Sequence, residues 1–327
     1  MKKRVRTITA GWPAILLTAL AIAGLHTNAP AQSITLDALQ RDGYGMVPIK
    51  RPQPNTLTVL ATVNDQKMRL IVDTGWGEDG LSLERGSFNA AGLPIEEVKR
   101  IGKSATGAKL TGITRTRADR VTLGNVEIRD VPLFLGNFKS LQHERARRTT
   151  GADGFLGAGF LRACSAVVDL HNLRVYLRPP GTGRRVQLGP ALQASGLSEV
   201  SFQQTAGHDC FVDVEINGTA GKMFLDTGAY LAGVDTRFAE QIKATAFNSR
   251  AGMIDAAGVV SRTQFTKLRS FKIAGISAKA PDVRLAKFGF YPESRGKVIG
   301  LLGMDILGAN GTIIDFGQQK LYFYPAN

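Results

Sequence analysis

The stretch Met68-Arg69-Leu70-Ile71-Val72-Asp73-Thr74-Gly75 places the tripeptide Asp-Thr-Gly at the end of an apolar run. Met223-Phe224-Leu225-Asp226-Thr227-Gly228 repeats this pattern 153 positions later (226 − 73). The repeat extends beyond the tripeptide, since Asn64 aligns with Asn217 at the same offset. A repeat that occurs only twice in a chain of 327 residues predicts two similar lobes rather than a solenoid.

A second shared element follows each Asp-Thr-Gly. Gly154-Phe155-Leu156-Gly157 matches Gly300-Leu301-Leu302-Gly303, and we call these two stretches the glycine blocks. Each glycine block leads into another apolar run that contains an aspartate, Asp169 or Asp315. We interpret these two aspartates as structural residues near strand ends.

The first 31 residues have the composition of a secretory signal. Four basic residues between positions 2 and 6 precede an apolar stretch from Trp12 to Leu25, and small residues follow up to Ala31. The apolar stretch is shorter than the roughly 20 residues that a membrane span requires. We therefore expect residues 1–31 to be a cleaved signal peptide, which predicts a periplasmic or secreted protein with no membrane span in the mature chain. An uncleaved membrane anchor is the alternative.

Charge, cysteine and histidine content bear on which partners and metals the protein could bind. The net charge of +14 favours anionic partners such as membrane surfaces or acidic polypeptides, although an ordinary solvated surface also explains it. Nucleic-acid binding is not expected, because the sequence has no recognition-helix pattern and no aromatic residues among its basic ones. The spacing of Cys and His shows no metal site. Cys164 and Cys210 could form a disulfide or remain two buried thiols.

From Met46 onward the sequence alternates in the manner of β-strands. Short β-branched runs end in turn pairs such as Asn64-Asp65 and Asn217-Gly218, and a short helix is expected over 237–243. Many short strands with glycine-rich turns are typical of β-barrels or sandwiches. The Pro- and Gly-containing segment 178–185 suits a linker. We therefore expect an N-terminal lobe over 32–180 and a C-terminal lobe over 181–327.

Two Asp-Thr-Gly turns could carry out acid–base hydrolysis if they meet. A single copy would indicate only a turn, because Asp side chains commonly accept backbone N–H groups in turns. Two carboxylates that follow apolar strands are costly to bury unpaired. If Asp73 and Asp226 meet across a pseudo-twofold axis, they share one proton and their pKa values separate. The ionised carboxylate could then activate a water, while the protonated one donates to the carbonyl under attack.

These motifs resemble the pepsin/retropepsin-like aspartic protease family, in a bacterial form with both lobes on one chain. The resemblance covers about residues 45–327 and rests on the two Asp-Thr-Gly stretches and the two glycine blocks. It implies an all-β fold of two acid-protease-type β-barrel lobes, related by pseudo-twofold symmetry, with the active-site cleft between them. It implies the catalytic pair Asp73 and Asp226, and supporting residues in the same loops, Thr74, Gly75, Thr227 and Gly228.

The residues after each Asp-Thr-Gly depart from the pepsin pattern, which has a hydroxyl there. Ala229 follows the second copy, as in retropepsins, but Trp76 follows the first. The indole could line a binding pocket or crowd the cleft. Without those hydroxyls the pair should be less acidic, so we expect a pH optimum that is mildly acidic or neutral.

Family members close a hairpin, the flap, over the substrate. The candidates are Gly102 to Gly112, centred on Thr106, Gly107 and Ala108, and Asp255 to Val260, around Gly258. Two ordinary glycine turns are the alternative.

We therefore expect an exported aspartic endopeptidase that acts on polypeptides, without a cofactor or metal. The alternative is a catalytically inactive peptide-binding protein of the cell envelope. One chain supplies both halves of the site, so a monomer is expected.

Overall fold

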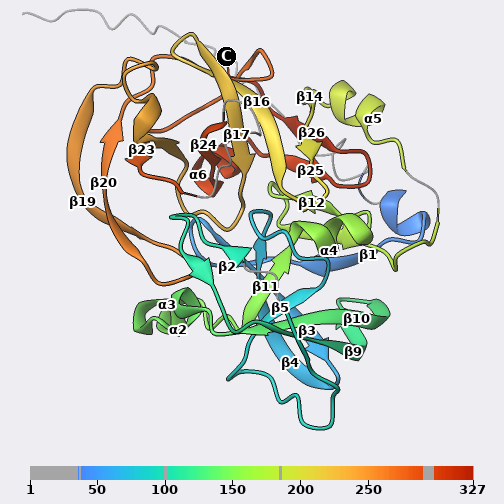
Figure 1. Cartoon of the computed structure of the whole chain (residues 1–327). Helices are drawn as coiled ribbons and strands as arrows, with labels where there is room; N and C mark the ends of the chain where they lie inside the picture. The colour runs from blue at the N-terminus through green and yellow to red at the C-terminus, as the bar shows by residue number, and fades with distance from the viewer. Residues whose placement is uncertain (1–35, 37, 99–101, 184–185, 290–297, 327) are drawn as a thin grey trace, which may run out of the picture.

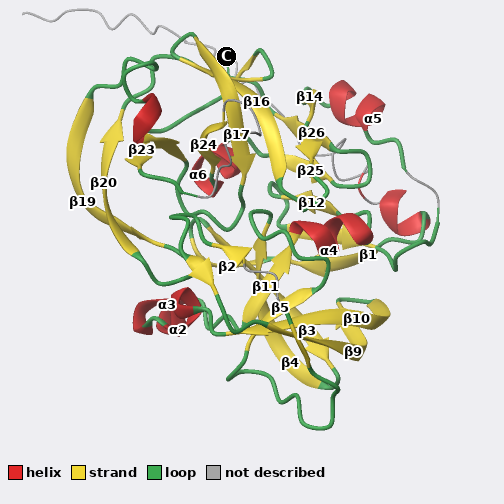
Figure 2. Ribbon diagram, viewed as in Figure 1, coloured by secondary structure: helices red, strands yellow, loops and turns green. Residues whose placement is uncertain are grey.

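The computed structural model of the chain describes residues 36, 38–98, 102–183, 186–289 and 298–326. The expected signal peptide, residues 1–31, lies outside this part of the chain. Within it the fold is mostly β, with short helices at the edges, and it forms two lobes (Figures 1 and 2). Among these residues, no helix has the length and apolar character needed to cross a membrane. The all-β, two-lobed prediction is therefore confirmed.

The first lobe is a closed β-barrel. Strands β3, β4, β11, β5, β10 and β9 pair in that order, and β9 pairs back onto β3. β2 and β6 extend this sheet at its edges. The strands are β2 (Lys50–Gln53), β3 (Thr56–Val63), β4 (Gln66–Asp73), β5 (Leu81–Glu84), β6 (Glu96–Glu97), β9 (Thr114–Leu123), β10 (Val126–Gly136) and β11 (Gly154–Gly157). A separate hairpin is formed by β7 (Gly102–Lys103) and β8 (Lys109–Leu110).

The second lobe repeats the order of the first. Strands β17, β24, β18, β23 and β20 correspond to β4, β11, β5, β10 and β9. In the first lobe the pairing of β9 with β3 closes the barrel. In the described residues of the second lobe, β20 does not pair with β16, the counterpart of β3. β16 pairs with β21 instead, so this sheet is open. The strands are β15 (Gln203–Gln204), β16 (Cys210–Ile216), β17 (Thr219–Leu225), β18 (Gly233–Asp235), β19 (Ala246–Ile254), β20 (Val260–Thr266), β21 (Phe271–Ile273), β22 (Ile276–Ser277), β23 (Val283–Ala286) and β24 (Val298–Leu302).

A third sheet joins the lobes. It runs β1-β13-β12-β25-β26-β14, and its centre is the antiparallel pairing of β12 with β25, which contain the equivalent aspartates Asp169 and Asp315. Both aspartates accept backbone N–H groups of the turns that follow them, which agrees with a structural role. The strands are β1 (Gly45–Pro48), β12 (Val167–Asp169), β13 (Arg174–Leu177), β14 (Ser198–Ser201), β25 (Ile313–Asp315) and β26 (Lys320–Phe323).

Helices are short and lie around the sheets. They are α2 (Lys139–Gln142), α3 (Glu144–Thr149), α4 (Ala158–Ala163), α5 (Gly189–Ala194), the 3-10 turn η1 (Thr236–Phe238) and α6 (Met304–Ala309). α4 and α6 begin directly after the two glycine blocks. The helix expected over 237–243 was wrong in extent. Asp235 caps the backbone N–H of Arg237 as expected, but the helical geometry ends after one turn, and the chain continues in turns that bury Ile242 in the core.

The main hydrophobic core is continuous between the lobes, and both cysteines belong to it. Cys164 and Cys210 are free and buried, so the disulfide that the sequence allowed is not formed, and the structure has the alternative of two buried thiols. Each thiol lies among apolar side chains, and Cys210 donates to the carbonyl of His208. Burial raises the pKa of each thiol to about 12, so neither is ionised at neutral pH.

We expect both thiols to be unreactive in the folded protein. Titration with a disulfide reagent at pH 8 should detect no fast-reacting thiol in the native state and both thiols after denaturation without reductant. Detection of neither thiol in the denatured, unreduced protein would show that the two cysteines are bonded, and would contradict the structure.

Candidate functional site

Parallel strand pairs bring both Asp-Thr-Gly loops to the boundary between the lobes. β4 ends at Asp73 beside Gly157 of the first glycine block. β17 ends at Leu225 beside Leu302 of the second, and the backbone N–H of Asp226 donates to the Leu302 carbonyl at 3.1 Å. The apolar ends of both strands are packed into the fold: Met68, Leu70 and Val72 of β4 are buried, and so are Met223, Phe224 and Leu225 of β17. The glycine blocks therefore fix where the two loops begin.

Thr74 and Thr227 join the two loops by reciprocal hydrogen bonds. Each hydroxyl accepts the backbone N–H of the other threonine, at 3.0 and 2.9 Å. Each hydroxyl also donates to a carbonyl of the opposite strand, at 2.9 Å to Leu225 and 2.7 Å to Val72. Both side chains are fully buried. The loops therefore cannot separate without leaving buried polar groups unpaired, which costs about 1–3 kcal/mol for each group.

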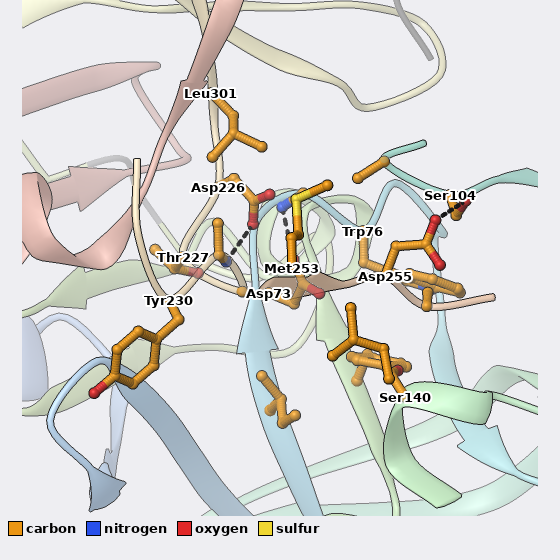
Figure 3. A pocket seen from close by; sticks show the side chains of 18 of the residues that line it. Asp73, Trp76, Ser104, Ser140, Asp226, Thr227, Tyr230, Met253, Asp255 and Leu301 are labelled. Atoms are coloured by element: carbon orange, nitrogen blue, oxygen red, sulfur yellow. Dashed lines mark hydrogen bonds between the residues drawn. The ribbon is translucent and has the colours of Figure 1, made fainter. Parts of the chain in front are cut away.

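The two aspartates face each other across this junction (Figure 3). A Cβ placed on Gly228 would lie 2.3 Å from Cγ of Asp73, and one placed on Gly75 would lie 2.7 Å from Cγ of Asp226. Each carboxyl thus packs on the glycine of the opposite loop, where any side chain would collide with it. The backbone N–H of Gly75 donates to Asp73 and that of Ala229 donates to Asp226, both at 2.9 Å.

Burial and mutual repulsion make the pair weakly acidic. Burial, the negative charge of Asp226 and a hydrogen bond between the two carboxyls raise the pKa of Asp73 well above its ordinary value, despite backbone N–H donors. Burial raises the pKa of Asp226 to about 6, against the lowering by hydrogen bonds from Ala229, Gly228 and Asp73. Two close carboxyls cannot both ionise easily. The pair therefore retains one proton under mildly acidic conditions.

The pair opens into a cavity of about 1040 Å³ that both lobes line. Trp76 and Ala229, the residues after the two Asp-Thr-Gly copies, both line it. The indole of Trp76 stacks on Phe155 with ring centroids 4.8 Å apart, meets Phe138 edge-on at 5.2 Å and donates to the Ser82 hydroxyl at 2.6 Å. The structure thus places Trp76 in the cavity wall as part of an aromatic cluster.

Both flap candidates are hairpins, and their tips have the same turn. The first is β7–β8 and the second is the long β19–β20 hairpin, which curves from the second lobe toward α2 (Figure 1). Gly107 and Gly258 occupy equivalent turn positions with φ of +85° and +81°, which glycine adopts readily. Ala108 accepts the backbone N–H of Ser104 in the first turn. The cavity lining includes Ser104, Ala105 and Leu110 from the first hairpin and Gly252 to Ala256 and Val260 from the second. Thr106, Gly107, Ala108 and Gly258 do not line it.

The two tips are hydrogen-bonded to each other, in an arrangement that we call the flap latch. Oδ2 of Asp255 accepts the hydroxyl of Ser104 at 2.5 Å (Figure 3). It also accepts the hydroxyl and the backbone N–H of Thr106. Burial raises the pKa of Asp255, but hydrogen bonds from Ser104, Thr106 and Val259 outweigh this and hold it below the ordinary value. At neutral pH the latch is therefore an ionised carboxylate with its donors, and Ser104 and Asp255 line the same cavity as Asp73 and Asp226.

Ser104 and Asp255 lie within the flap ranges predicted from the sequence but were not singled out there, and Arg284 was not predicted at all. Ser104 and Asp255 are equivalent in the repeat, since each lies three positions before the turn glycine (107 − 3 and 258 − 3), so an alignment of the two flaps could have found them. Arg284, in β23, also lines the cavity, and the sequence gives no signal for it. In the described part of the chain, no group of three or more His, Cys, Asp or Glu residues is placed to hold a metal.

The raised pKa values predict that the aspartate pair destabilises the fold as the pH rises. The folded state holds the proton of Asp226 more tightly than the unfolded chain does, so this stability is fully present below about pH 4 and is lost as the pH rises through about 6. Asp226→Asn should therefore melt at a higher temperature than the wild type at pH 8, with a smaller difference at pH 4. Thermal unfolding followed by circular dichroism tests this. A difference in melting temperature that does not change with pH would contradict the assignment.

Removal of the flap latch should make the two flap hairpins open more often. In Asp255→Ala the donors of Ser104 and Thr106 lose their acceptor, so we expect amide hydrogen exchange over 102–112 and 255–260 to be at least about tenfold faster. Asp119→Ala, an exposed aspartate on β9, is the matched control. Equal exchange in all three proteins would mean that the latch does not hold the flaps in solution.

A family model matches both lobes, and solved structures with a similar fold are known. The family model described as "Aspartyl protease" matches residues 59–160 and 212–306, one segment in each lobe. Among solved structures, Basic 7S globulin from soybean is similar with a TM-score of 0.49 and 12% identity, over 86% of this chain and 95% of that one. The aspartic proteinase from Irpex lacteus is similar with a TM-score of 0.48 and 13% identity, over 87% and 98%.

The comparison with curated proteins gave no match. The family model, however, covers more than half of the chain, and its two segments contain both Asp-Thr-Gly loops. The chain therefore belongs to the aspartyl protease family.

Proposed function

We propose that this protein is an aspartic endopeptidase that hydrolyses peptide bonds with a water activated between Asp73 and Asp226. The observation that carries the proposal is the paired geometry of the two carboxyls, each packed on the glycine of the opposite loop. Their raised pKa values support a state with one shared proton. That state supplies a base and an acid at the same place.

The roles follow from the protonation state. The ionised carboxyl takes a proton from the water as its oxygen attacks the carbonyl carbon of the scissile bond. The protonated carboxyl donates to the carbonyl oxygen, and the tetrahedral product then collapses as the amine leaves with a proton. Thr74 and Thr227 position the pair and touch no reacting atom. No cofactor takes part in these steps.

A polypeptide is the substrate that the cavity suits. Its volume of about 1040 Å³ exceeds that of most small-molecule pockets, and two hairpins whose tips are hydrogen-bonded to each other line it. The aromatic wall around Trp76 and the apolar residues of the second lobe offer separate surfaces for side chains on either side of the scissile bond. Residues 1–31 support the further proposal that the enzyme is exported to the periplasm or secreted. Because one chain supplies both aspartates, we also propose that it acts as a monomer.

Cleavage of a denatured polypeptide tests the activity. We expect wild-type protein to cleave it, a pepstatin-type inhibitor to block cleavage, and Asp226→Asn to reduce kcat by at least about 10³-fold, because the general acid–base pair is lost. Asp119→Asn, outside the cavity, should retain wild-type activity.

The pH dependence of kcat/KM should be bell-shaped, with its maximum under mildly acidic to neutral conditions, since burial keeps the pair singly protonated there. A maximum below about pH 3 would contradict the raised pKa values. Folded wild-type protein that binds peptides but cleaves none between about pH 3 and 8 would favour an inactive peptide-binding protein instead.

A further inference from the structure

Arg284 is a charged residue in an otherwise apolar wall of the cavity. On β23 its neighbours Val283 and Leu285 point into the main core, so Arg284 and Ala286 point to the opposite face. Ala286 there belongs to an apolar cluster with Leu301 and Met253, both of which line the cavity (Figure 3). Arg284 lines the same cavity and is only 9% exposed.

Among the described residues, the guanidinium of Arg284 forms no ion pair with a carboxylate. Its Nε is buried without a hydrogen bond, and no ion pair involves it. Burial lowers the pKa of Arg284, and the charge of Asp305 offsets this only in part. Oδ1 of Asp305 accepts the backbone N–H groups of Ala232 and Ile306, while its Oδ2 has no partner. An unpaired buried charge is costly, so its presence needs an explanation.

The fold does not require an arginine at this position. In the second lobe Arg284 pairs with Gly233, which pairs with Leu301 of the glycine block. In the first lobe the equivalent chain of pairings runs from Phe134 through Ser82 to Phe155. The equivalent position of the first lobe is therefore occupied by an aromatic side chain, Phe134. The arginine is a feature of the second lobe alone.

The other charged residues of the cavity are acidic, and one histidine, His143, also lines it. Arg284 is the only Lys or Arg among the described cavity-lining residues, although the chain has 41 such residues. Glu78, Asp209 and Asp255 line the cavity in addition to the aspartate pair. A carboxylate on a bound peptide would thus be repelled over most of the cavity and attracted at one place.

We propose that Arg284 is a specificity-determining residue that binds a carboxylate of the substrate. This inference rests on the proposed peptidase function and adds the substrate class, a peptide with an acidic group at one fixed position relative to the scissile bond. The guanidinium can donate two parallel hydrogen bonds to a carboxylate, a geometry that an amide or a hydroxyl cannot match. The carboxylate can come from a Glu or Asp side chain or from the free C-terminus of a short peptide.

Peptide scanning on the wild-type protein tests the proposal first. Peptides with an amidated C-terminus carry a single Glu, or its neutral isostere Gln, at each position around the scissile bond, and a second set of neutral peptides ends in a free acid or an amide. We expect kcat/KM to be about tenfold to a hundredfold higher for Glu than for Gln at one position, or for the free acid over the amide at one peptide length. Equal values throughout would overturn the proposal.

Variants then assign the preference to Arg284. Arg284→Gln should abolish the Glu-over-Gln ratio while retaining cleavage of the neutral peptide, which also reports that the variant is folded. Arg284→Lys should retain part of the ratio, because it keeps the charge but not the two parallel donors. Arg269→Gln, an exposed arginine of the same lobe outside the cavity, should leave the ratio unchanged. A wild-type ratio in Arg284→Gln would overturn the proposal.

Failure of the peptidase function can be distinguished from failure of this inference. Cleavage of neutral and acidic peptides with equal efficiency would support the enzyme and overturn the role of Arg284. If the wild type cleaves nothing, equilibrium binding of the same peptides decides the matter. A preference for the acidic peptide that Arg284→Gln removes would support the role of Arg284, and equal binding would overturn it.

Discussion

The reciprocal hydrogen bonds between Thr74 and Thr227 are the constraint on which the rest of the structure depends. They are fully buried, and they join two loops that are 153 residues apart in the chain. Because each threonine also donates to the strand behind the opposite loop, the two lobes are fixed where the aspartates meet. The closed barrel, the shared sheet and the glycine blocks can be understood as the framework that brings these two residues together. Without them, the two loops would lose the hydrogen bonds that hold Asp73 and Asp226 together.

The two lobes have a similar strand order, but the walls that they contribute to the cavity differ in their residues. In the first lobe the wall is the aromatic cluster of Trp76, Phe138 and Phe155. In the second lobe it is apolar and contains Arg284. The flap tips have the same turn, yet one supplies hydroxyl donors and the other a carboxylate acceptor, so the two can hydrogen-bond where identical tips could not. Having both lobes on one chain allows each half of the cavity to differ and to recognise a different part of a peptide.

The sequence predicted the framework well because the framework depends on local patterns. The apolar runs before Asp73 and Asp226, the turn pairs and the glycine blocks all lie in the expected elements. It could not decide between a disulfide and two free thiols, because the positions of Cys164 and Cys210 depend on how the lobes pack. The helix expected over 237–243 was too long, since the burial of Ile242 overrides a weak local preference.

Residues that act across the cavity were the hardest to predict. Arg284 has no sequence signal, because one arginine among 41 basic residues becomes notable only when its burial is known. The contact of Asp255 with Ser104 depends on the closure of two hairpins that are far apart in the chain. The boundary between lobes at residue 180, and the expected export, stay predictions.

The central claim is that Asp73 and Asp226 share one proton, and it can be measured directly. Protein labelled with carbon-13 at the aspartate side-chain carboxyls would be titrated by NMR, with single Asp→Asn variants to assign the two signals. We expect two coupled steps, with one carboxyl ionised and the other protonated over an interval that includes about pH 6. Two independent titrations near the ordinary value of 3.8, each unaffected by substitution of the other aspartate, would contradict it.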